Sequence, residues 1–416
     1  MPTFRAPSMT TFLSVENPHF VRNHPHFSAK THNYEEGRDV IQSLIEKIKN
    51  EFLISVVHGG DRTVEGAVIH QTRNPRSDKS YASVAADIAN SLTRLGFKRV
   101  DLIPEDMRIG DRMRQFGTGI AWINSGGTQG YASTAHAASM MEMFGVPYIG
   151  HNPFHAALLD NKHIFKHCLN SIGVKTPEFL VVDFNNSDYS EKLSEQFDTV
   201  FPGVEYFVVK PVSGRASLHV HRARGRQEAR NLALQVHQAT GNLVMIERFI
   251  SGVEYTVAVN GPYVSVARKL ENLSAPFTFS PTMRIMGTDE PIFTSMDLLP
   301  IGSDRCKLLD PNDAKQKEII LALYNIATRI HNGFGLEAMV RVDIRSDPDG
   351  QLYVLEANPK PDLQMPSGSK FSFVASGLSQ YGMDYDDLIL TAFAARIHFL
   401  ITHRRVMIPQ IVNLIR

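Results

Sequence analysis

Between residues 51 and 150, short apolar runs alternate with segments of helical spacing. The apolar runs include FLISVVHGG, RVDLIP and IAWINSGG, and the segments between them include YASVAADIANSLTRLGF and TAHAASMMEMFG. Parallel strands need crossover connections, which are usually helices, so this alternation indicates a parallel sheet covered by helices. The segment is therefore predicted to form a Rossmann-like α/β domain.

Two glycine pairs follow predicted strands of this domain, Gly59-Gly60 and Gly126-Gly127. Small residues at the carboxyl ends of parallel strands let a ligand approach the backbone N–H groups. Ordinary tight turns explain either pair equally well.

Composition excludes several classes of protein. The chain has 416 residues, which suggests about three domains, and 43 basic residues balance 43 acidic ones. We therefore expect no nucleic-acid partner. Two cysteines give no disulfide framework, which is typical of a cytoplasmic protein.

Residues 1–50 are expected to be an N-terminal extension without a secretory signal. The run LILTAFAARIHFLI is too short to span a membrane and is expected to be a core or interface helix.

A hairpin is predicted near the C-terminal end, where DPDG separates the runs AMVRVDIRS and LYVLEANPKPD. Glu356 and Asn358 lie two residues apart and so share one face of their strand. A four-residue loop would place Arg341 opposite Glu356 and Asp343 diagonal to it. Hard oxygen ligands of this kind suit Mg²⁺, and an arginine suits a phosphate. Solvated charges at a strand end are the simpler alternative.

Two further segments suggest a nucleotide site. In EYFVVKPVSGRAS, Lys210 lies where a predicted strand gives way to a Ser/Gly loop, which suits holding phosphates under a lid. In NLVMIERFISGVEYTV, a short linker with Glu247 and Glu254 joins two predicted strands, and could offer backbone groups to an adenine and a carboxylate to a ribose. No G-x-x-x-x-G-K-[ST] motif is present, which excludes a P-loop.

Taken in order, four segments make the chain resemble the ATP-grasp superfamily, and within it the D-alanine–D-alanine ligases. They are YIGHNPFHAALLDNKHIFK, FVVKPVSGRAS, VMIERFISGVEYTV and VRVDIRSDPDGQLYVLEANPKPD. The resemblance implies a three-lobed α/β ATP-grasp architecture: an N-terminal pre-ATP-grasp domain (51–150), a central subdomain (151–245) and a C-terminal subdomain with the metal site (246–416). It also suggests a possible homodimer.

The resemblance further implies site residues, with ATP and Mg²⁺ as cofactors. Nucleotide contacts are expected from Lys162, Lys210, Glu247, Arg248, Phe249, Ile250 and Glu254. The expected Mg²⁺ ligands are Asp343, Glu356 and Asn358. The expected catalytic residues are Arg341, which would hold the transferred phosphate, Ser217 in the covering loop, and Glu65, which would orient the first substrate's amine. Ser367 would receive the second substrate's carboxylate.

The substrate half departs from the family pattern. Glu65 comes one position later than in the family, NSGGTQG (124–130) replaces a histidine-glycine and acidic loop, and Phe277 and Phe279 stand in the expected acceptor loop. We therefore predict an ATP-dependent ligase that joins amino acids or similar small acids other than D-alanine and releases ADP and phosphate. The alternatives are a regulatory, synapsin-like ATP-binding protein and a true D-alanine–D-alanine ligase.

Overall fold

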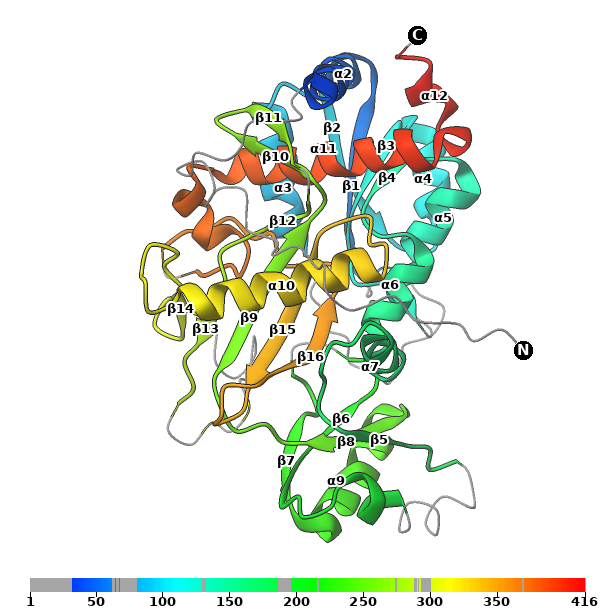
Figure 1. The fold of residues 1–416 in the computed structure, drawn as a ribbon. Coiled ribbons are helices and arrows are strands. Elements are labelled where there is room, and N and C mark those ends of the chain that lie inside the picture. Colours follow the sequence, from blue (N-terminus) through cyan, green and yellow to red (C-terminus); the bar gives the residue numbers. More distant parts are fainter. Residues whose placement is uncertain are drawn as a thin grey trace, which may run out of the picture.

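The computed structural model describes residues 32–415, apart from 62–63, 65–66, 68–80, 129–131, 186–195, 215–216, 274, 288–289, 291, 293–300 and 369. The expectation for Glu65 lies outside the described residues. The described residues form a two-stranded hairpin sheet and three larger sheets, and Figure 1 shows the larger ones one above another, with helix α11 crossing the upper part.

The upper sheet is parallel, as the alternating sequence pattern predicted. Its strands are β1 (Leu53–Gly59), β2 (Arg99–Glu105), β3 (Ile120–Asn124) and β4 (Tyr148–Ile149), in the order β2-β1-β3-β4. The connecting helices are α3 (Ala82–Arg94), α4 (Ile109–Phe116) and α5 (His136–Phe144), with a short 3-10 turn at Ser133–Ala135. The carboxyl ends of β1, β2 and β3 meet at one edge, where Gly60 follows β1, Asp106 follows β2 and Ser125 follows β3.

The lowest sheet in Figure 1 is antiparallel and small. It is formed by β5 (Phe179–Val182), β6 (Tyr206–Pro211), β7 (His221–Arg224) and β8 (Val244–Arg248), in the order β5-β8-β6-β7. Helix α9 (Gly225–Thr240) buries Ala229, Ala233 and Val236 in its separate core. Helices α6 (Pro153–Asp160) and α7 (Lys162–Ser171) connect this part to the upper sheet.

The middle sheet has six strands and carries the predicted hairpin. They are β9 (Glu254–Asn260), β12 (Phe277–Thr278), β13 (Thr282–Arg284), β14 (Cys306–Leu308), β15 (Val340–Ser346) and β16 (Leu352–Asn358), ordered β14-β13-β9-β15-β16 with β12 beside β9. Helix α10 (Lys317–Gly333) lies along one face and buries Ile320, Leu323 and Ile330 there.

The first and last parts of the described chain share one core. Helix α2 (His32–Glu51) buries Ile41, Leu44, Ile45 and Ile48 against α11 (Tyr385–His403) and the β10–β11 hairpin (Tyr263–Val266 and Lys269–Asn272). Helix α11 is buried along almost its whole length, so the run LILTAFAARIHFLI is a core helix. The remaining elements are η2 (Ala375–Tyr381), η3 (Arg405–Met407) and α12 (Pro409–Val412). No helix in the described ranges is long and apolar enough to cross a membrane.

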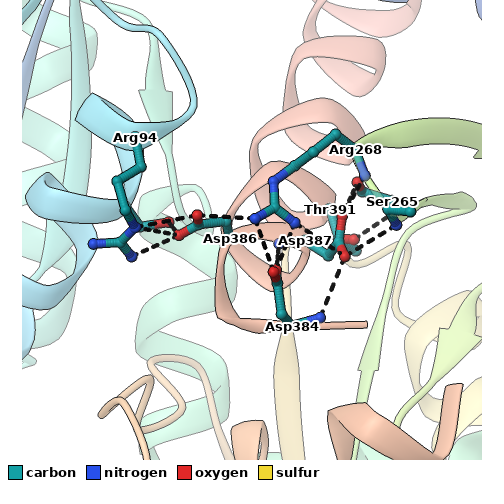
Figure 2. Close-up of polar contacts among 9 residues, drawn as sticks. Arg94, Ser265, Arg268, Asp384, Asp386, Asp387 and Thr391 are labelled. Carbon is teal, nitrogen blue, oxygen red and sulfur yellow. Dashed lines mark hydrogen bonds and ion pairs between the residues drawn. The ribbon is translucent and has the colours of Figure 1, made fainter. Parts of the chain in front are cut away.

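A polar network ties the N-terminus of α11 to two other elements (Figure 2). Asp384 caps the helix in a capping box with Asp387. Arg268 binds Asp384 at 2.6 Å and 2.8 Å and Asp386 at 3.0 Å, and Arg94 of α3 also binds Asp386. The helix start is therefore fixed to α3 and to the β10–β11 hairpin together.

Asp387 stabilises the tight turn of that hairpin. Ala267 and Arg268 have φ values of 49° and 64°, a left-handed conformation that is unfavourable for residues other than glycine. The buried Asp387 carboxylate accepts hydrogen bonds from the N–H groups of both residues and from the Ser265 hydroxyl. These bonds compensate for the strained backbone.

We therefore expect Asp387→Ala to lower the free energy of unfolding by about 3 kcal/mol, because it leaves buried donors without an acceptor. Urea denaturation measures the loss. Asp111→Ala removes a carboxylate from an exposed ion pair with Arg114 and should change stability by less than about 0.5 kcal/mol. Equal losses in the two variants would contradict a structural role for the network.

Candidate active site

A cleft with an empty volume of about 760 Å³ lies where the lowest and middle sheets of Figure 1 meet. Its walls come from β6, β8 and the loop after β6 on one side, and from β9, β13, β15 and β16 on the other. Most of the residues expected to bind nucleotide or metal line it. They are Lys162, Lys210, Glu247, Arg248, Phe249, Ile250, Glu254, Asp343 and Glu356, and Ser217, which was expected to be catalytic, lines the cleft too.

The hairpin predicted to carry the metal ligands forms, but its predicted register was wrong. The loop runs from Asp347 to Gln351, because the Asp347 carboxylate accepts hydrogen bonds from the N–H groups of Asp349 and Gln351, and Ser346 therefore pairs with Leu352. A β-bulge between Asp343 and Ile344 then shifts the pairing by one more residue. Asp343 consequently lies directly opposite Glu356, and Arg341 lies opposite Asn358.

Asp343 is buried in a dense set of donors. It accepts hydrogen bonds from the Thr256 hydroxyl at 3.0 Å, from Arg341 at 3.1 Å and 3.0 Å, and from the Asn358 amide at 3.4 Å. The guanidinium of Arg284 forms an ion pair with it at 3.0 Å. The predicted grouping of Arg341, Asp343 and Asn358 is therefore present, with Arg341 directed at the carboxylate.

Glu356 faces the cleft beside a lysine. Its carboxylate is 3.1 Å from the Lys162 ammonium, and 31% of its side chain is exposed. Partial burial would raise the pKa of Glu356, but Lys162 and Lys210 hold it well below its ordinary value. Glu356 is therefore ionised throughout the physiological pH range and available to a cation.

Local structure fixes both predicted phosphate lysines. Lys162 begins α7 immediately after Asn161, whose side chain caps the helix by accepting from the Ile164 N–H group. Its backbone N–H donates to the Val212 carbonyl and its ammonium to the Gly214 carbonyl, at 3.0 Å each. Lys210 is the penultimate residue of β6 and binds Glu247 at 2.5 Å. Both cations therefore lie at the loop that follows β6.

Lys166 is a third lysine of this site that sequence reasoning missed. It is fully buried and lies 2.9 Å from the second carboxylate oxygen of Glu247. Burial lowers the pKa of Lys166 to about 8, while Lys166 and Lys210 lower the pKa of Glu247 against the effect of burial. Lys166 follows Lys162 by four residues and so lies on the same face of α7, a spacing that could have revealed it.

Glu254, one of the expected nucleotide contacts, is also paired with cations. It forms a short ion pair with Arg284 and lies 3.7 Å from Arg345. Burial raises the pKa of Glu254, and Arg284 opposes that rise. Arg345 follows Asp343 by two residues on β15, so strand alternation could have placed it on this face. No sequence signal identified Arg284.

Phe249, in the linker between β8 and β9, lies close to two arginines. The Phe249 ring lies 4.8 Å from the guanidinium carbons of both Arg222 and Arg345, which is a favourable cation–π distance. The backbone N–H groups of Arg248 and Phe249 donate to the carbonyl oxygens of Glu178 and Tyr206. The linker between β8 and β9 is therefore hydrogen-bonded to the lowest sheet of Figure 1.

The substrate half agrees less well with expectation. Ser217 reaches the cleft with a left-handed φ of 55°, but Ser367 is exposed and does not line the cleft. Phe277 and Phe279 do not belong to a loop over an acceptor site. β12 pairs with β9, and both rings are fully buried, with Phe277 packing against Tyr381. They are core residues, so they give no support to an altered acceptor pocket.

Polar residues do gather at the carboxyl edge of the upper sheet. Ser125 hydrogen-bonds to Glu105, and the Asn124 amide donates to the carbonyl of Tyr81. The ammonium group of Lys360, two residues after β16, lies 3.3 Å from the centre of the Tyr81 ring. This contact brings the segment after β16 against the start of α3.

Comparisons with known proteins identify the family of the chain. The family model described as D-ala D-ala ligase C-terminus matches residues 168–393. The D-alanine–D-alanine ligase of a Marinomonas strain is 25% identical over 350 residues, covering 83% of this chain and 96% of that protein. That of Alcanivorax borkumensis is 26% identical over 349 residues, covering 84% and 95%.

Solved structures show the same fold. The D-alanine–D-alanine ligase of Bacillus anthracis, complexed with ATP, has a TM-score of 0.58 at 17% identity and covers 84% of this chain and 98% of its own. That of Coxiella burnetii has a TM-score of 0.60 at 17% identity, covering 87% and 100%. The chain has the ATP-grasp fold and belongs to the D-ala D-ala ligase C-terminus family.

Proposed function

We propose that the protein is an ATP-dependent ligase that joins a carboxylate to an amine through an acyl phosphate, releasing ADP and inorganic phosphate. One observation carries the proposal: a single cleft brings the cations Lys162 and Lys210 together with the acids Asp343 and Glu356. The names of the curated relatives, and the ATP bound to a structural neighbour, support the same activity.

The proposed reaction has two steps. A carboxylate oxygen of the first substrate attacks the γ-phosphorus of ATP, and the bond from that phosphorus to the bridging oxygen breaks to release ADP. The amine of the second substrate then attacks the acyl carbon, loses a proton and expels inorganic phosphate. Lys162, Lys210 and Arg341 would offset the charge of the phosphates, and the segment around Ser213–Ser217 would exclude water from the acyl phosphate.

The donor set of the hairpin fits Mg²⁺. Asp343 and Glu356, which are paired across β15 and β16 and line the cleft, and Asn358, two residues beyond Glu356, supply hard oxygen atoms, which Mg²⁺ prefers as ligands. A bound Mg²⁺ would supply positive charge beside the phosphates. We propose these three residues as its ligands.

We further propose amino acids or similar small acids as substrates. The relatives are named D-alanine–D-alanine ligases, and one structural neighbour is named as a D-Ala:D-Ser ligase. D-alanine is therefore one candidate, while the sequence NSGGTQG at 124–130 departs from the family pattern and favours a different substrate. A screen of single and paired D- and L-amino acids for phosphate release decides between D-alanine and other amino acids. The highest kcat/KM for D-alanine alone would identify a true D-alanine–D-alanine ligase.

The nucleotide product should be ADP, with one inorganic phosphate per amide formed. An attack on the γ-phosphorus leaves the α–β bond of ATP intact, so AMP and pyrophosphate have no route of formation. ³¹P NMR of a complete reaction distinguishes the two outcomes. Stoichiometric pyrophosphate would refute the acyl-phosphate mechanism.

A regulatory ATP-binding protein is the alternative. It would bind ATP in the same cleft but release no phosphate with any amino acid in the screen. The presence of both lysines and both acids in one cleft favours the ligase, because binding alone does not require the full set.

A further inference from the structure

Asp343, the acid proposed to bind Mg²⁺, already has a full set of partners. A carboxylate offers about four acceptor positions. The Thr256 hydroxyl, two nitrogens of Arg341, the Asn358 amide and one nitrogen of Arg284 all lie within 3.4 Å of its oxygens. A metal ion can reach Asp343 only if one of these donors leaves.

Of the two arginines that hold Asp343, Arg284 is the better placed to leave. Arg341 holds Asp343 through two hydrogen bonds from its own strand, whereas Arg284 reaches it from β13 through one nitrogen. Arg284 also lines the nucleotide cleft together with Lys162 and Lys210. Its guanidinium is therefore positioned among the groups expected to meet phosphate.

The surroundings keep the Arg284 guanidinium in place during such an exchange. Another of its nitrogens forms a short ion pair with Glu254, and its guanidinium carbon lies 4.8 Å from the centre of the Phe373 ring. A planar guanidinium has five N–H donors, so it can keep Glu254 while it exchanges one partner. Phosphate oxygens are strong partners for it, because both groups are charged.

We propose that the ion pair with Arg284 blocks metal binding to Asp343 while the cleft holds no nucleotide. Once Mg²⁺ replaces Arg284 on that carboxylate, Arg284 binds a phosphate oxygen of ATP. The inference rests on the proposed function, which makes Asp343 a metal ligand. It assigns Arg284 a role in nucleotide binding and makes metal binding depend on nucleotide. Free divalent cations are then excluded from the empty cleft.

Arg284→Met tests the proposal, because methionine fills similar space without charge or donors. In the absence of nucleotide, the variant should bind Mn²⁺ ~10-fold more tightly than the wild type, measured by the EPR signal of free Mn²⁺. At saturating Mg²⁺, it should bind adenylyl imidodiphosphate ~10-fold more weakly by calorimetry. The two affinities change in opposite directions, which a general disturbance of the fold would not produce.

Arg305→Met is the matched control. Arg305 is a neighbouring, mostly buried arginine that pairs with Glu290 and does not line the cleft. Both affinities should stay at wild-type values in this variant. Should Arg284→Met fail to fold, Arg284→Gln, which keeps one amide donor, provides the same comparison.

An unchanged Mn²⁺ affinity, or an unchanged affinity for the ATP analogue, in a folded Arg284 variant overturns the proposal. A failure of the proposed function gives a different result: the wild-type protein would release no phosphate in the amino-acid screen. The two failures are therefore distinguishable.

Discussion

Asp343→Asn and Glu356→Gln should each lower kcat by on the order of 10²- to 10³-fold, at saturating ATP and Mg²⁺, while the fold persists. Both changes preserve side-chain size but remove a negative charge that is proposed to hold Mg²⁺ beside the phosphates. Glu356 is the cleaner test, because its side chain is partly exposed and, among the described residues, it forms an ion pair with Lys162. Asp343 has more partners, so its variant needs a check of folding by circular dichroism.

Asp349→Asn is the control for this pair. Asp349 is an exposed acid in the turn of the same hairpin, away from the cleft. Its variant should retain wild-type kcat. If Asp343→Asn and Glu356→Gln also retained it, the hairpin would carry no metal site.

Lys210→Ala should weaken binding of an ATP analogue and lower turnover together, each by on the order of 10²-fold. The lysine is proposed to meet phosphate oxygens, and its 2.5 Å ion pair with Glu247 fixes its position. The substitution also leaves Glu247 with Lys166 as its remaining lysine partner among those that the structure shows. Calorimetry and phosphate release measure the two effects separately.

Lys175→Ala provides the comparison, because Lys175 is an exposed lysine that donates to Gln351 in the loop between β15 and β16. Wild-type binding and turnover are expected there. Normal nucleotide affinity in Lys210→Ala would make Lys210 a structural partner of Glu247 only.

Sequence reasoning located the cleft because its residues occur in an ordered set of segments. Strand alternation placed Glu356 and Asn358 on one face, and the strand-end position of Lys210 suggested a phosphate contact. The register of the hairpin could not be obtained in the same way. The register depends on the Asp347 side chain, which closes a loop one residue longer than predicted, and on a bulge beside Asp343. Neither feature follows from the alternation of residues along the strands.

The residues that sequence reasoning misjudged are those whose role depends on distant partners. Phe277 and Phe279 resembled loop residues, but the pairing of β12 with β9 buries them. Arg284 reaches the site because β13 pairs with β9, which sets it opposite Glu254. Lys166 was accessible to a helical-spacing argument, since α7 carries it one turn beyond Lys162.

The core shared by α2, α11 and the upper sheet has a consequence for how the chain acquires its structure. Ile45 and Ile48 of α2 and Ile54 of β1 pack in the same cluster as Leu388 and Phe393 of α11, more than 300 residues later. Contacts of such large sequence separation close slowly. During synthesis, the face of the first sheet that packs against α11 therefore stays incomplete until nearly the whole chain is present, whereas its other face is covered by residues of the same domain, such as Ile109 and Met141.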